Sequence, residues 1–95
     1  MDKAHIISQL KAIKPELVKN YAIKNIGLYG SYIKNSYNSD SDIDILIELG
    51  KPLGWNFFDI QFKLEGLFNK RIDLVTKKSL RKELKENILK EVVFV

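Results

Sequence analysis

Apolar residues recur every three or four positions in several stretches of the chain, a spacing that places them on one face of a helix. Pro15 interrupts the first such stretch, because proline lacks an amide hydrogen and disfavours helical geometry in the residue before it. Proline does suit the first turn of a new helix, so we expect two short helices before residue 22. The expected helices span residues 3–13, 15–21, 56–68 and 79–92.

Shorter apolar runs between these helices predict β-strands at residues 25–30, 42–49 and 71–76. The second run follows a polar loop at residues 36–41 and ends at a glycine- and proline-rich break, residues 50–54. The order helix, strand, strand, helix, strand, helix predicts an α/β (α+β) fold, with a small mixed sheet flanked by helices. At 95 residues the chain is expected to form one domain, residues 1–95, around a single core.

Two acids open the second predicted strand. Asp42 and Asp44 alternate with isoleucines, so their side chains share one face, about 6.5 Å apart along the strand. Such carboxylates repel each other unless a divalent cation lies between them, and Mg²⁺ prefers these oxygen ligands. The alternative is a solvated hairpin edge, with Asp40, Ser41 and Asp42 as turn formers. The apolar neighbours of Asp44 favour the metal, because an acid among such residues is costly without a partner.

The Gly30-Ser31 pair lies upstream of these acids, at the end of the first predicted strand. Glycine permits a phosphate to approach the backbone closely, and Ser31 offers an amide and a hydroxyl as donors. A short helical turn is expected at residues 31–36. Asp73 lies in the mostly apolar third strand, where it would supply the third acid needed to serve two metal ions.

The segment Gly30-Ser31, ten intervening residues and then Asp42-Ile43-Asp44 resembles the signature of the nucleotidyltransferase superfamily that includes DNA polymerase β. With its short length and its Ser41-Asp42-Ile43-Asp44 form, the whole chain is similar to the minimal nucleotidyltransferases, the MntA-like antitoxins. The resemblance implies catalytic and metal-binding roles for Asp42, Asp44 and Asp73. It implies nucleotide binding by Gly30, Ser31, Lys34 and Ser41. Family members usually carry Arg-Gly where this chain has Lys34-Asn35.

The resemblance also implies an activity. It predicts a Mg²⁺-dependent enzyme, with two ions and ATP as substrate, that transfers AMP to a tyrosine of a HEPN-domain (HepT-like) RNase toxin. The chain would then be the antitoxin of a type VII-like toxin–antitoxin pair. Two alternatives stay open: an antitoxin that blocks its partner by contact alone, and an enzyme that adds nucleotides to RNA ends.

Charge and composition narrow these options. The net charge of +4 and a pI near 9.3 suit nucleic-acid binding, but acids alternate with the basic residues as on a solvated helix face. Nucleic acid is therefore not expected as the primary partner. The chain has no cysteine, no apolar run of about 20 residues and no recognisable signal peptide. The expected location is the cytoplasm, with no membrane contact.

A few residues allow two interpretations. Tyr37 either stacks on a base or caps the polar loop, and we favour the loop role. Phe57 is expected in the core, whereas Trp55 fits the core and an exposed binding patch equally well. The apolar tail, residues 92–95, is expected to pack on the sheet rather than on a partner. His5 is expected to be an exposed helix residue without a functional role.

Overall fold

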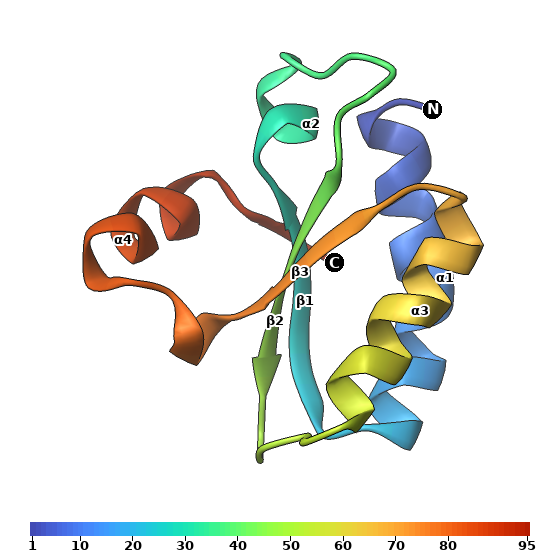
Figure 1. The fold of residues 1–95 in the computed structure, drawn as a ribbon, viewed down its shortest axis with the longest axis vertical. Coiled ribbons are helices and arrows are strands. Elements are labelled where there is room, and N and C mark those ends of the chain that lie inside the picture. Colours follow the sequence, from blue (N-terminus) through green and yellow to red (C-terminus); the bar gives the residue numbers. More distant parts are fainter.

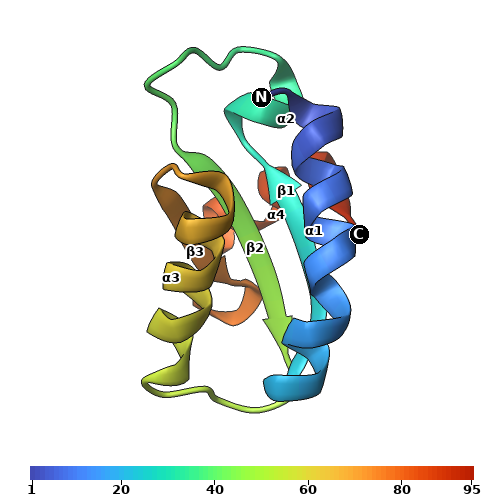
Figure 2. The ribbon, with the colours of Figure 1, turned by 90° about the vertical axis from the view of Figure 1, so that its right-hand side faces the viewer.

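The computed structural model describes all 95 residues, which form one four-stranded sheet with helices on both faces (Figures 1 and 2). The strand order is β3-β2-β1-β4. Strand β1 is antiparallel to β2 and β4, whereas β2 and β3 run parallel, so the predicted mixed sheet is confirmed. The elements are α1 (Lys3–Asn20), β1 (Ile23–Tyr29), α2 (Ser31–Lys34), β2 (Ile43–Leu49), α3 (Asn56–Phe68), β3 (Ile72–Thr76), the 3₁₀ turn η1 (Lys77–Ser79), α4 (Lys82–Glu91) and β4 (Val93–Phe94).

The hydrophobic core lies between the sheet and the helices α1 and α3, which cover the same face (Figure 2). Alternate residues of a strand point to opposite faces, so Ile43, Ile45 and Ile47 of β2 all enter this core. The residues between them, among them Asp44, are thereby turned to the opposite face. Helix α4 lies on that face (Figure 1). Fully buried side chains of the core are Ile6, Leu10, Leu17, Ile26, Leu28, Ile43, Ile45, Ile47, Ile60 and Leu64.

The prediction of two short helices before residue 22 is wrong. A single helix, α1, runs from Lys3 to Asn20 with Pro15 inside it. Proline removes one helical hydrogen bond and leaves the carbonyl of residue 11 without its donor, but Lys11 is exposed and water can serve that carbonyl. Leu10 and Leu17 are fully buried on either side of the proline, so packing on the sheet holds the two segments in line.

The last helix is also shorter than predicted. It begins at Lys82, because the expected N-cap Ser79 is part of η1 and bonds to Thr76 instead. The Ser79 amide donates to Thr76 Oγ1 at 3.2 Å, and the Ser79 hydroxyl donates to the Thr76 carbonyl at 2.9 Å. Beyond α4 the apolar tail forms β4 along β1, where the Val95 amide donates to the Ile26 carbonyl at 2.9 Å. The prediction that the tail packs on the sheet is confirmed.

The aromatic residues around the start of α3 divide between core and surface. Phe57 packs against the core, whereas Trp55 is 84% exposed and Phe58 is 46% exposed. Trp55 and Phe58 therefore leave an apolar patch on the surface of the molecule. None of the helices is both long and apolar enough to cross a membrane.

Candidate active site

Two acids meet on the face of the sheet that carries α4. Asp44 of β2 and Asp73 of β3 are direct register partners in the parallel pair, and neighbouring strands lie about 4.8 Å apart. Their flanking residues Ile43, Ile45 and Leu74 are buried in the core on the other face. The sheet therefore brings together two carboxylates that are 29 positions apart in the sequence, with the third strand beside the second as predicted.

This proximity changes the protonation of Asp44. Its pKa is raised from 3.8 to about 6, most of all by burial, and also by the charge of Asp73, by a hydrogen bond between the two carboxyl groups and by the charge of Asp42. A backbone hydrogen bond from Ser31 acts in the opposite direction. Accumulated negative charge of this kind, built from oxygen donors, fits a hard divalent cation such as Mg²⁺.

Asp42 does not belong to this register pair. It is exposed and lies in the loop end immediately before β2, where the amide of Ile43 donates to the carbonyl of Arg71 at 3.1 Å. Asp42, Asp44 and Asp73 do not form a closed cluster of three ligands in this structure. The sheet assembles the pair Asp44 and Asp73, and the metal-binding role of all three acids stays a prediction.

Gly30 connects β1 to α2 at the edge of this acid pair. Its backbone has φ 75° and ψ −147°, a conformation that only glycine adopts readily. A Cβ atom at this position would lie 2.9 Å from Cγ of Asp44. The absence of a side chain at residue 30 thus lets the turn and Ser31 lie against the Asp44 carboxylate. This close approach explains why a glycine precedes Ser31.

The remaining predicted nucleotide-binding residues make contacts of their own. Lys34, at the end of α2, forms an ion pair with Glu91 of α4, with 3.2 Å between Nζ and Oε2. Ser41 Oγ accepts the Asn38 amide at 2.9 Å, which gives this serine a role in shaping the loop. Tyr37 stacks on Tyr32 with ring centroids 4.3 Å apart, consistent with the favoured loop role.

Two residues near the acid pair were missed by sequence reasoning, Tyr29 and Glu91. Tyr29 is the register partner of Asp44 on β1, and its pKa is raised above the ordinary value by burial and by the charges of Asp44, Asp73 and Glu91. Strand alternation before Gly30 could have placed Tyr29 on this face. Glu91 is 61 positions from Gly30, and no pattern in the sequence around it indicates that it lies near the acid pair.

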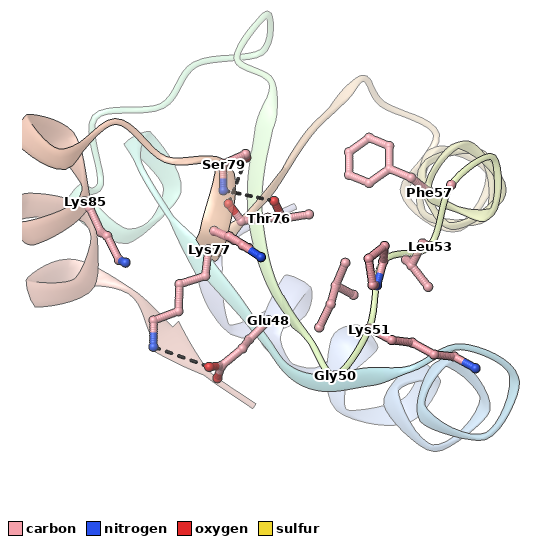
Figure 3. Close-up of a pocket in the computed structure, with 13 residues that line it drawn as sticks. Glu48, Gly50, Lys51, Leu53, Phe57, Thr76, Lys77, Ser79 and Lys85 are labelled. Carbon is pink, nitrogen blue, oxygen red and sulfur yellow. Dashed lines mark hydrogen bonds and ion pairs between the residues drawn. The ribbon is translucent and has the colours of Figure 1, made fainter.

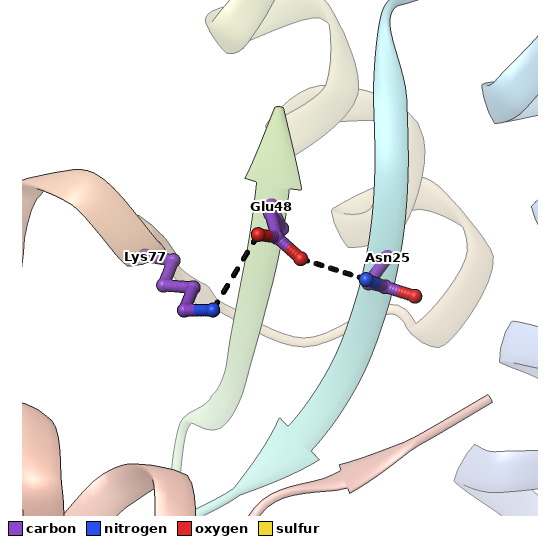
Figure 4. A network of polar contacts seen from close by, with 3 residues as sticks. All are labelled: Asn25, Glu48 and Lys77. Carbon is purple, nitrogen blue, oxygen red and sulfur yellow. Dashed lines mark hydrogen bonds and ion pairs between the residues drawn. The ribbon is translucent and has the colours of Figure 1, made fainter. Parts of the chain in front are cut away.

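A separate cavity lies at the far end of β2 (Figure 3). Its volume is about 680 Å³, and four lysines line it: Lys51, Lys77, Lys78 and Lys85. Glu48 in its wall accepts from Asn25 Nδ2 at 2.7 Å and pairs with Lys77 at 3.4 Å (Figure 4). The Asn25 hydrogen bond and then the Lys77 charge lower the pKa of Glu48. Because Glu48 is four residues from Asp44, about 13 Å along the strand, this cavity is separate from the acid pair.

Comparisons with known proteins agree with the geometry. Residues 10–95 match the family described as nucleotidyltransferase domain. The protein adenylyltransferase MntA of Thermococcus cleftensis is 38% identical over 91 residues, which cover 95% of this chain and 92% of that protein.

Three solved structures share the fold. A minimal nucleotidyltransferase superposes with a TM-score of 0.84 at 23% identity, covering 98% of this chain and 95% of that one. A toxin–antitoxin structure with AMP-PNP gives 0.74 at 26% identity, with 90% and 70% coverage. A tri-AMPylated Shewanella oneidensis HEPN toxin in complex with its MNT antitoxin gives 0.69 at 22% identity, with 94% and 70% coverage. The chain therefore belongs to the minimal nucleotidyltransferase family of MntA-like protein adenylyltransferases, within the nucleotidyltransferase superfamily that includes DNA polymerase β.

Proposed function

We propose that this protein transfers AMP from ATP to a tyrosine hydroxyl of a HEPN-domain toxin of the HepT type, as the antitoxin of a type VII-like pair. The observation that carries the proposal is the Asp44 and Asp73 pair, held in register beside the Gly30-Ser31 turn. The Shewanella oneidensis complex supports the choice of acceptor, since its HEPN toxin is AMPylated and its antitoxin shares this fold.

The reaction requires one bond to form and one to break at the α-phosphorus of ATP. The tyrosine oxygen attacks this phosphorus, the bond to the oxygen that bridges to the β-phosphate breaks, and pyrophosphate leaves. When bound, Mg²⁺ supplies neutralisation of the charge that develops on the phosphate oxygens. Asp42, Asp44 and Asp73 would hold the metal, and Asp73 would also orient the attacking hydroxyl and accept its proton. The exposure of Asp73 suits this role, because the acceptor tyrosine arrives from outside.

The phosphate end of ATP is assigned to the turn that precedes α2. Ser31 offers its hydroxyl to the β- and γ-phosphates, since its amide is bonded to Asp44, and Lys34 adds a positive charge. Gly30 contributes space rather than a donor, because its amide is already bonded to Glu91 at 3.1 Å. Catalysis of this kind needs positioning and electrostatic stabilisation more than covalent participation by the protein.

The decisive experiment measures the intact mass of the cognate HEPN protein after incubation with ATP, Mg²⁺ and this protein. We expect mass increases of one or more adenylyl units with wild type and none with Asp42→Ala/Asp44→Ala. Asp59→Ala is the matched control, because Asp59 is an exposed acid on α3 away from the acid pair. A stable complex without any mass increase would contradict transfer and leave an antitoxin that acts by contact. The exposed Trp55 and Phe58 offer a surface for such a contact.

A further inference from the structure

A fourth acid approaches the site from α4, the helix on the same face of the sheet as the acid pair (Figure 1). Glu91 is the last residue of α4, and its carboxylate binds both ends of the short helix α2. Oε1 accepts the amide of Gly30 at 3.1 Å, and Oε2 pairs with Lys34 Nζ at 3.2 Å. Its side chain is 21% exposed, against 62% for Lys34, so the carboxylate is the more buried half of the pair. One side chain therefore connects α4 to the whole turn assigned to the phosphates.

A fourth carboxylate at this end of the sheet carries an electrostatic cost. Asp42, Asp44 and Asp73 already give this end of the sheet a negative charge, and another carboxylate nearby adds repulsion. The two contacts of Glu91 compensate for that cost, because hydrogen bonds and ion pairs that involve charged groups are stronger than neutral ones. No residue of α4 is fully buried, so packing alone does not fix the end of this helix.

We propose that Glu91 is a positioning residue, which holds the Gly30-Ser31 turn and Lys34 in the arrangement that binds the triphosphate. Its carboxylate fixes the direction of the Gly30 amide, and this in turn restrains the turn that carries the Ser31 hydroxyl. It also restrains Lys34, whose long side chain would otherwise sample many rotamers. This inference rests on the proposed function, in which the turn binds ATP.

The opposite role for the same contacts is inhibition. If the Glu91 carboxylate took the place of a phosphate group, ATP would have to displace it, and removal of the carboxylate would tighten ATP binding. A positioning role predicts the reverse sign, because removal would loosen the turn. The sign of the change in affinity therefore separates the two roles.

The test compares Glu91→Ala and Glu91→Gln with wild type by titration with ATP and Mg²⁺, without any toxin present. We expect the alanine variant to bind ATP about 10-fold more weakly, within the range found for residues that orient ligating groups. The glutamine variant retains an oxygen that accepts the Gly30 amide, so we expect it to recover part of the loss. In AMP transfer, KM for ATP should rise while kcat changes little. Glu86→Ala is the control, because Glu86 is an exposed acid on α4 whose side chain pairs only with Lys90, at 3.9 Å.

A second readout needs neither ATP nor transfer. Exchange of the Gly30 amide hydrogen, followed by NMR, should be faster in Glu91→Ala than in wild type, with Glu91→Gln close to wild type. Unchanged exchange, or unchanged or tighter ATP binding, in Glu91→Ala would overturn the inference. If wild type binds ATP but modifies no HEPN protein, the proposed function fails while a weakened Glu91→Ala still supports the positioning role.

Discussion

The carboxylate of Asp44 occupies the space that any side chain at Gly30 would need. A Cβ at residue 30 would lie 2.9 Å from Cγ of Asp44, and the φ of 75° at Gly30 is itself unfavourable for other residues. Two independent constraints therefore demand glycine at the point where β1 turns into α2. The same contact ties the position of the phosphate-binding turn to that of the acid, so a change at either residue affects both.

Gly30→Ala tests this relationship through stability. We expect it to lower the free energy of unfolding by about 1 to 3 kcal/mol. The new methyl group must displace the Asp44 carboxylate, and the backbone of residue 30 has a positive φ that is unfavourable for alanine. Chemical denaturation measures the change. Gly66→Ala is the matched control, since Gly66 lies within α3 and has open space around it. Alanine there should stabilise by about 0.5 to 1 kcal/mol. Equal stability of Gly30→Ala and wild type would show that the turn adapts without cost.

The pKa of Asp44 predicts how stability depends on pH. In the folded protein this pKa is raised from 3.8 to about 6, so between these values the native state holds more protons than the unfolded state. The contribution of protonated Asp44 is fully present below 3.8 and is lost as the pH rises through about 6. Ionised Asp44 thus destabilises the metal-free protein at neutral pH.

Asp44→Asn removes the destabilisation caused by the ionised carboxylate, and so tests whether this charge lowers stability at neutral pH. With a chelator present, we expect the variant to have a higher Tm than wild type at about pH 7.5, and the difference to shrink towards zero near pH 4. Each kcal/mol shifts Tm by about 4 to 8 °C in a domain of this size. The variant should lose AMP transfer at the same time, because function and stability make opposite demands on this residue. A Tm difference independent of pH would contradict the role of the charge.

Addition of Mg²⁺ should relieve the same repulsion. A ligand that binds only the native state stabilises it by about 2.7 kcal/mol at 100 times its Kd. We therefore expect the Tm of wild type to rise with Mg²⁺ concentration, and that of Asp73→Asn to rise much less. Sodium chloride at matched ionic strength controls for screening. An equal response of the two proteins would remove Asp73 from the metal site.

The two acids of the pair were predictable from the sequence, although they are 29 positions apart in it. Alternation in β2 placed Asp44 on the face opposite the core isoleucines, and the need for a third acid to serve two metal ions singled out Asp73. The register of the parallel strands β2 and β3 then places the two acids side by side. The contact of Glu91 with Gly30 was beyond such reasoning, because it depends on where α4 ends relative to β1. The continuous helix through Pro15 was missed for a related reason, since tertiary packing outweighed a local preference.

The tail strand β4 depends on Gly27, and this yields a last prediction. A Cβ at residue 27 would lie 2.6 Å from Cγ2 of Val92 and 3.0 Å from the backbone carbonyl of Val93. A backbone atom cannot move aside as a flexible side chain can, so Gly27→Ala should displace β4 from β1 and cost about 1 to 3 kcal/mol. Exchange of the Val95 amide, which donates to Ile26 at 2.9 Å, should accelerate.

The double variant Gly27→Ala/Val92→Ala provides the control for that prediction. It removes the closest side-chain clash but leaves the carbonyl of Val93 in place, so we expect only partial recovery relative to Val92→Ala alone. Because Glu91 directly precedes Val92, displacement of β4 should also weaken the contact with Gly30 and lower the affinity for ATP. A Gly27→Ala protein with unchanged stability and unchanged Val95 exchange would mean that β4 tolerates the added methyl group. The end of α4 would then be held by the Glu91 contacts rather than by the pairing of β4 with β1.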